Sequence, residues 1–311
     1  MMGSLLLFLL LTGVLVWKIL DAEQPMRVVP LKPTMSPQNE DKQLGDSVPM
    51  VNEPVAEEPE VESASPVEHE PEEAFSPMHV PLYSAMKVHG VALIIDDVGY
   101  DLHALQRLLN LSVPMAISIL PNAPKVARSA KMAHQAGQVV MLHLPMEPSS
   151  EHYRARMDSS FLTVDMDEES VRRVMLQHIS AIPYIEGVNN HMGSRLTSMA
   201  DSMSWVMQVC REKNLFFVDS KTSGKSVAAT MAKTYGLPWG SRTLFLDDSI
   251  DMLAMNKMWH KIQACVAQER RCIVIAHPHR ESVAFLEQHQ EELQRWPMLP
   301  VQALLHMRIK Q

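Results

Sequence analysis

The sequence predicts a parallel α/β fold, either a barrel or an open sheet, for residues 89–311. Short apolar runs alternate there with amphipathic, helix-like segments. The runs are β-branched or continuously apolar, as strands covered on both faces tend to be. Six of the seven runs are followed at once, or within two residues, by an acidic or histidine side chain. In a parallel α/β fold these strand ends lie on one side, where sites are built.

The elements follow in order along the chain. The strand candidates are 91–95, 115–120, 138–142, 186–189, 215–218, 242–246 and 272–276. The helix candidates are 123–136, 167–181, 200–213, 225–235, 252–270 and 281–295. Gly137 is a natural C-cap for the first helix, and Pro183 follows the second. This alternation favours a parallel sheet.

Two segments precede the predicted domain. Residues 1–20 carry one charge, Lys18, and twenty helical residues span about 30 Å, the hydrocarbon thickness of a membrane. Because no basic residue precedes the run and no A-x-A site follows it, we expect an uncleaved anchor, with a cleaved signal segment as the alternative. Residues 21–88 hold 11 of the 21 prolines and predict a disordered linker.

Charge and cysteine content exclude some classes of protein. The linker has 14 acidic against 4 basic residues, whereas the chain from residue 89 onward has 22 acidic against 23 basic ones. Because no basic patch stands out, we expect no nucleic-acid partner. The 3 cysteines show no CxxC spacing, and a domain of this size needs no staple, so we expect three unpaired, buried thiols.

Histidines follow three of the predicted strands, and two adjacent acids follow a fourth. The histidines are His143, His191 and His277, and the acids are Asp96 and Asp97. Capping and turn formation explain Asp or Asn after a strand but not histidine. We therefore expect these side chains to converge on a site.

Histidine and aspartate ligands from distant positions, without thiolates, suit a catalytic Zn²⁺ or a similar divalent cation. A nearby cation also makes two adjacent carboxylates tolerable, because one can bind it while the other acts as a base. A histidine can protonate the leaving group. The pattern predicts metal-assisted hydrolysis.

Six motifs resemble the divergent polysaccharide deacetylase family, a remote branch of the NodB-type carbohydrate esterases. They are IIDDVGY (94–100), LHLPMEP (142–148), GVNNHMGSRLTS (187–198), FFVDS (216–220), FLDDS (245–249) and IAHPH (275–279). The resemblance covers residues 89 to 300. It implies a distorted (β/α) barrel of about seven parallel strands, like those of the NodB-type deacetylases and glycoside hydrolases.

The resemblance also implies roles. Asp96 matches the base and Asp97 a metal ligand, while His143 matches the first metal histidine and His277 the acid. His191, in NNHMGS, is the candidate third ligand.

The chain departs from the wider esterase pattern at two motifs. Glu147 stands where that pattern has a second histidine, and NNHMGS replaces an Arg-containing motif. With these departures, metal binding through Asp97, His143 and His191 could survive while the deacetylase efficiency is changed or lost.

Three further residues are candidates for contact with substrate. Asn190 could donate to a substrate oxygen or simply make a turn, and Asp219 could orient a catalytic group or cap a helix. His279 lies two residues after His277, so an extended backbone would point both the same way.

These observations predict a membrane-tethered, metal-dependent hydrolase that removes N-acetyl groups from an envelope polysaccharide, such as peptidoglycan. We expect the domain in the periplasm, held at the inner membrane, or secreted if the N-terminal segment is cleaved. One alternative is a glycan or envelope-protein binding module that retains the metal without turnover. Another is a metal-dependent hydrolase of a different bond, such as a phosphoester.

Overall fold

The computed structural model describes residues 88–307, so the predicted anchor and nearly all of the predicted linker lie outside the described residues. The strands are β1 (Gly90–Val98), β2 (Met115–Ile119), β3 (Val139–Met146), β4 (Ile185–Met192), β5 (Phe216–Asp219), β6 (Trp239–Ser241), β7 (Leu244–Phe245) and β8 (Arg271–Ala276). The helices are α2 (Leu102–Leu109), α3 (Val126–Gln135), α4 (Glu151–Arg154), α5 (Glu168–Ala181), α6 (Ala200–Glu212), α7 (Ala228–Thr234), α8 (Met252–Ala267), α9 (Arg280–Gln288), α10 (Gln290–Arg295) and the 3₁₀ turns η1 (Leu196–Ser198) and η2 (Val301–Leu304).

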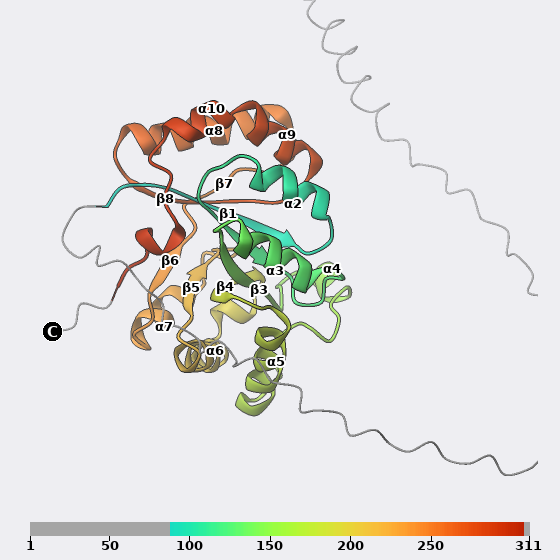
Figure 1. Ribbon diagram of the computed structural model, residues 1–311. Coiled ribbons are helices and arrows are strands. Elements are labelled where there is room, and N and C mark those ends of the chain that lie inside the picture. Colours follow the sequence, from blue (N-terminus) through green and yellow to red (C-terminus); the bar gives the residue numbers. More distant parts are fainter. Residues whose placement is uncertain (1–87, 308–311) are drawn as a thin grey trace, which may run out of the picture. The chain divides into compact units, whose positions relative to one another are not determined.

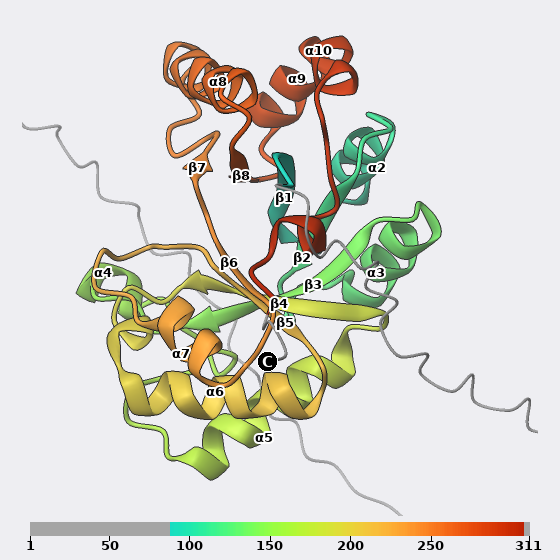
Figure 2. The same cartoon turned by 90° about the vertical axis from the view of Figure 1, so that its left-hand side faces the viewer.

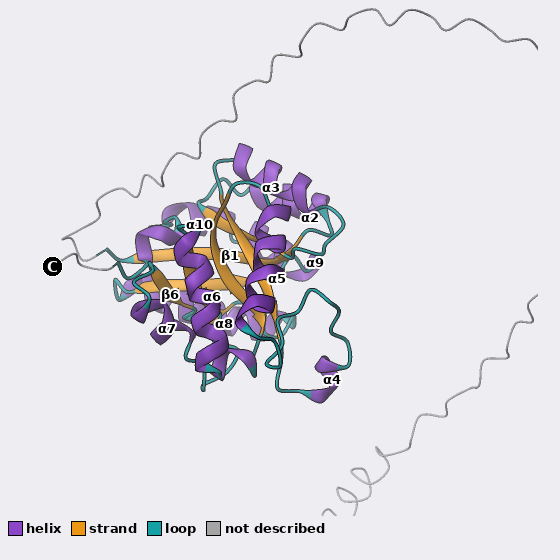
Figure 3. Cartoon of the chain, turned by 90° about the horizontal axis from the view of Figure 1, so that it is seen from below, coloured by secondary structure: helices purple, strands orange, loops and turns teal. Residues whose placement is uncertain are grey.

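All eight strands form one parallel sheet in the order β6-β5-β4-β3-β2-β1-β8-β7. Helices surround the strands, with α8, α9 and α10 gathered near β8 and α5, α6 and α7 near β3 to β5 (Figures 1 and 2). The view from below shows the strands enclosed among these helices (Figure 3). The parallel α/β prediction is therefore confirmed, with eight strands instead of about seven.

The sheet curls because its two edge strands are joined by two residues. Arg242 and Thr243 connect β6, at one edge, to β7, at the other. An extended chain advances only about 3.3–3.6 Å per residue, so the two edges must lie close together. The Arg242 amide donates to the carbonyl of Asp219, the last residue of β5, and the Thr243 amide donates to the Ile273 carbonyl of β8. Two consecutive residues thus bond to strands near opposite edges, so the sheet is nearly closed, which confirms the predicted distorted barrel.

The alternation of side chains along the strands gives the sheet a core on each face. On β1, Leu93 and Ile95 belong to the larger core, which the surrounding helices complete. Ala92 and Ile94 belong to a smaller core inside the curl, where Val301 and other residues of η2 fill the space. A strand buried on both faces reads as a continuous apolar run, which is why β1 could be predicted.

Several elements differ from the prediction. The structure adds α2, capped by Asp101, whose carboxylate accepts from two backbone amides of the first turn, and it adds α4 and β6. The predicted strand 242–246 is reduced to the two-residue β7, and the predicted helix 281–295 is broken at His289 into α9 and α10. None of the helices within residues 88–307 is both long and apolar enough to cross a membrane.

Two of the three cysteines pair, so the expectation of three unpaired thiols was wrong. Cys265 of α8 and Cys272 of β8 form a disulfide, with their Cα atoms 6.5 Å apart, inside the usual range for such bonds. The chain reverses direction in the short connection between α8 and β8, which brings the two cysteines together. Their spacing in the sequence matches no cysteine motif. Cys210 is free and buried.

Reduction of this disulfide is expected to destabilise the protein. Its residues are 7 positions apart, and a loop of that size restricts the unfolded chain by about 2 kcal/mol. The free energy of unfolding of the full chain should fall by about that amount in reductant. The double variant Cys265→Ala/Cys272→Ala should be insensitive to reductant. Three reactive thiols in the unreduced, denatured chain, instead of the single thiol of Cys210, would contradict the pairing.

Candidate active site

The irregular C-terminal end of β1 places the carboxylates of two consecutive residues, Asp96 and Asp97, close together. Between Ile95 and Val98, β1 takes one residue more than β2 does over the paired stretch, which is a β-bulge. Within it Asp97 has a left-handed backbone, with φ at 56°. Asp96 Oδ2 lies 3.7 Å and Asp97 Oδ1 3.1 Å from the same atom, Nε2 of His143. The bulge therefore prevents the two carboxylates from pointing to opposite faces of the sheet.

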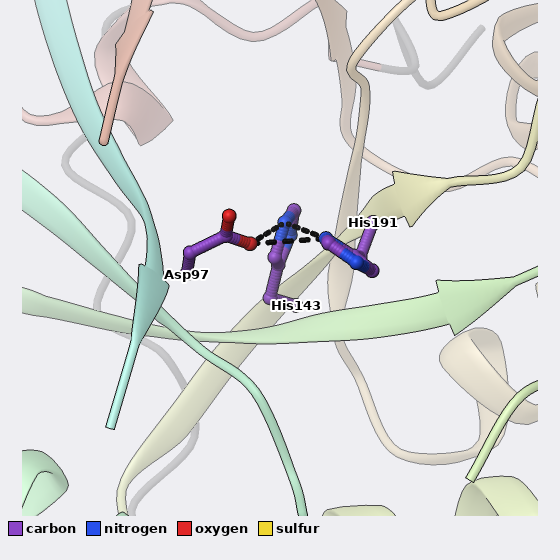
Figure 4. Close-up of side chains that lie close together, drawn as sticks. All are labelled: Asp97, His143 and His191. Atoms are coloured by element: carbon purple, nitrogen blue, oxygen red, sulfur yellow. Dashed lines mark hydrogen bonds and ion pairs between the residues drawn. The ribbon is translucent and has the colours of Figure 1, made fainter. Parts of the chain in front are cut away.

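Asp97, His143 and His191 form a compact three-donor cluster (Figure 4). His191 Nδ1 lies 3.0 Å from Asp97 Oδ1 and 3.1 Å from His143 Nε2. The histidines come from adjacent parallel strands, with His143 on β3 and His191 near the end of β4, where Pro145 is its register partner. The chain then turns away through Met192 and Gly193, both with positive φ. The structure thus brings together the three residues predicted as metal ligands.

The cluster fits a divalent cation. Asp97 Oδ1 is buried and makes no hydrogen bond of acceptable geometry with any described residue, although both imidazoles lie within 3.1 Å. Donor atoms around a tetrahedral zinc ion lie about 3.3 Å apart, close to these separations. The side chains of Asp97 and His191 are 33% and 19% exposed, so one side of the cluster remains accessible. Burial alone would raise the pKa of Asp97, but the two imidazoles hold that pKa below its ordinary value.

Asp96 is almost completely buried beside this cluster. Burial raises the pKa of its carboxyl group, although His143, His277 and Asn189 act in the opposite direction. Asp96 Oδ1 accepts a 2.8 Å hydrogen bond from Asn189 Nδ2. We predicted Asp96 from the strand-end pattern but did not predict Asn189. The sequence signal for Asn189 is a polar amide directly after Gly187 and Val188 in the predicted strand 186–189.

His277 follows β8 and is oriented by a buried carboxylate. Its Nδ1 lies 2.9 Å from Asp247 Oδ1, and its backbone amide donates to Asp247 Oδ2 at 2.8 Å. Ser282 Oγ donates to the same Oδ2 at 2.6 Å. Burial would lower the pKa of His277, but the nearby carboxylates, chiefly Asp247, outweigh it and raise the pKa to about 9.

His277 lies next to the cluster because β8 pairs with β1 up to Ala276 and Ile95, so the following residues are neighbours. The negative charges of Asp96 and Asp97 both act on His277. Asp247, which directly follows the predicted strand 242–246, is thus the partner of His277.

The three residues predicted to contact substrate have different surroundings. The Asn190 side chain donates to the Met192 carbonyl at 2.8 Å and accepts from the Ser220 amide at 2.9 Å, so it ties the end of β4 to the loop after β5. Asp219 accepts from the Lys221 amide and from Ser226 Oγ within its own loop. His279 is exposed at the start of α9, with its ring 5.7 Å from that of His277. Substrate contact by these residues stays a prediction.

Glu147, at the position of the missing histidine, has a structural partner. The carboxylate is buried and accepts from Arg195 at 2.6 Å and from the Val164 amide at 2.8 Å. The backbone carbonyl of Glu147 also accepts from the amides of Arg195 and Leu196. This residue therefore holds the loop that follows β4, and His191 occupies the third position of the donor cluster.

Two known bacterial proteins are similar to this chain in sequence. YibQ, an uncharacterized protein of Escherichia coli K12, is 32% identical over 198 residues, which cover 64% of this chain and 61% of that protein. An uncharacterized protein of Haemophilus influenzae Rd is 30% identical over 197 residues, 63% of this chain and 69% of its own length. The chain thus spans about three fifths of the E. coli relative.

The crystal structure of an uncharacterized protein from Agrobacterium tumefaciens C58 has the same fold, with a TM-score of 0.64 at 19% identity over 71% of this chain and 91% of that one. The model of the family described as divergent polysaccharide deacetylase matches residues 93–305, which is more than half of the chain. These residues contain the whole candidate site, from Asp96 to His277. The chain belongs to the divergent polysaccharide deacetylase family.

Proposed function

We propose that the chain is a metal-dependent hydrolase that removes N-acetyl groups from an envelope polysaccharide, either peptidoglycan or another N-acetylated glycan. The observation that carries the proposal is the convergence of Asp97, His143 and His191 within 3.1 Å of one another. Two groups suited to move protons, Asp96 and His277, lie beside them. Family membership supports the reaction class.

Asp97, His143 and His191 would hold the cation. Two imidazole nitrogens and one carboxylate oxygen suit Zn²⁺, and the absence of a fourth protein donor from the described cluster suits a catalytic rather than a structural ion. When bound, such an ion supplies a Lewis acid that polarises a carbonyl group and lowers the pKa of water.

The chain's own groups move the protons. Asp96, whose pKa burial raises, accepts a proton from the water that attacks the acetyl carbon. His277, which Asp247 keeps protonated, donates its proton to the amine nitrogen as the C–N bond breaks. The remaining proton of the acetic acid passes to the sugar amine, so the products are acetate and a protonated amine, and atoms and charges balance.

A location in the cell envelope is part of the proposal. The disulfide between Cys265 and Cys272 supports it, because such bonds persist in oxidising compartments like the periplasm. Residues 1–20, by their apolar sequence, would anchor the chain in the inner membrane, and a proline-rich linker would let the domain reach the glycan.

A binding module without turnover is the second candidate. It is favoured by Glu147, which replaces a histidine of the wider esterase pattern and is engaged by Arg195. Such a module would bind metal and glycan but release no acetate.

Metal content tests the ligand assignment. Asp97→Ala, His143→Ala and His191→Ala should each lose the stoichiometric zinc of the purified full chain, because each removes one of three donors. His279→Ala, which removes an exposed histidine outside the cluster, should retain it. Zinc content is measured by inductively coupled plasma mass spectrometry. Full zinc occupancy in all three ligand variants would refute the assignment.

Acetate release from N-acetylated glycans tests the reaction. Asp96→Asn should lower the turnover number by about 10²–10⁴, the usual contribution of a general base, while zinc is retained. Metal and glycan binding by the unmodified chain without acetate release would instead establish the binding module. Release of phosphate from phosphoesters in place of acetate would establish the alternative hydrolase.

The pH profile tests the pairing of Asp247 with His277. His277 acts in its protonated form, so activity should be present below its pKa and be lost as the pH rises through about 9. In Asp247→Asn that carboxylate no longer raises the pKa of His277, although Asp96 and Asp97 still do, so the descending limb should move to lower pH. Asp248→Asn, at the exposed neighbour, should leave the limb unchanged. An unchanged limb in Asp247→Asn would contradict this role.

A further inference from the structure

Asn189 joins the proposed base to a proposed metal ligand. It is fully buried and lies directly opposite His143 in the register of β3 and β4. Its Nδ2 is 2.8 Å from Asp96 Oδ1 and 3.3 Å from Ser220 Oγ. Its Oδ1 is 2.9 Å from His143 Nδ1 and 2.5 Å from Ser118 Oγ. One amide therefore contacts groups from four other segments of the barrel.

The polarity of these hydrogen bonds follows from the proposed role of Asp96 as a base. A base must be ionised before it takes a proton, and an ionised carboxylate only accepts hydrogen bonds, so the amide NH₂ of Asn189 must face Asp96. The amide oxygen must then face His143, and since that oxygen also only accepts, Nδ1 of His143 must carry a hydrogen. In a neutral imidazole the lone pair is then on Nε2, which is the atom that lies 3.1 Å from both Asp97 Oδ1 and His191 Nδ1.

We propose that Asn189 is a positioning residue that fixes the tautomer of His143, so that Nε2 is its metal-binding atom, and that holds Asp96 beside it. The inference rests on the metal site of the proposed function. A hydrogen bond to the second ring nitrogen of a metal-binding histidine commonly contributes about 10- to 100-fold in metal affinity. We expect Asn189 to have an effect of that size.

A simpler role in folding makes different predictions. If Asn189 only satisfied buried polar groups, any substitution would reduce stability and metal affinity together. Asn189→Asp separates the two roles because it keeps an oxygen that accepts from His143 but loses the donor to Asp96. It places a second carboxylate beside Asp96 and should be the less stable variant. Asn189→Leu removes both functions without adding charge.

The test is the zinc affinity of the full chain, measured by competition with a chelator. Asn189→Leu should bind zinc about 10- to 100-fold more weakly, and Asn189→Asp should stay within about threefold of the unmodified chain. Ser118→Ala, which removes another donor to the same amide oxygen, should also stay within about threefold. Unchanged affinity in Asn189→Leu, or equal losses in Asn189→Leu and Asn189→Asp, would overturn the proposal.

A measurement on the unmodified chain covers the case in which these variants fail to fold. Nitrogen NMR of the metal-free, ¹⁵N-histidine-labelled chain, assigned by comparison with His143→Gln, should show the hydrogen of His143 on Nδ1. A hydrogen on Nε2 alone would overturn the proposal. If the unmodified chain binds no zinc, the proposed function fails, and this measurement alone decides the role of Asn189.

Discussion

The bulge at the end of β1 is the constraint on which the site depends. A regular strand would send the carboxylates of Asp96 and Asp97 to opposite faces. One extra residue and a left-handed backbone at Asp97 bring both within 3.7 Å of the same imidazole nitrogen of His143. Aspartate tolerates this conformation better than most residues, so the residue that provides the ligand also permits the turn. The protonated His277 beside them, and the cation of the proposed function, would balance the two negative charges at this strand end.

His143 and His277 have hydrogen-bond partners of different charge. Asn189 gives His143 an uncharged acceptor, which suits a histidine that must be neutral to bind a metal. Asp247 gives His277 a negative charge, which raises its pKa to about 9 and suits a histidine that must keep its proton. The hydrogen-bond partner of each histidine thus determines whether that histidine is suited to bind a metal or to donate a proton.

Much of this arrangement could be predicted from the sequence, because parallel strands carry continuous apolar runs and end at one edge. Asp97, His143 and His191 could be placed together on that ground. Asn189 could not, because its importance lies in its register opposite His143, and a strand pattern alone does not show register. The pairing of Cys265 with Cys272 was missed for a similar reason, since it depends on how α8 turns into β8.

Anomalous X-ray diffraction at the zinc absorption edge, from crystals of the protein grown with zinc, is the most direct test of the central claim. The account predicts one strong peak within about 2.0–2.2 Å of Asp97 Oδ1, His143 Nε2 and His191 Nδ1 together. A peak bound through His143 Nδ1, a peak at other residues, or an empty cluster in the presence of excess zinc would contradict it.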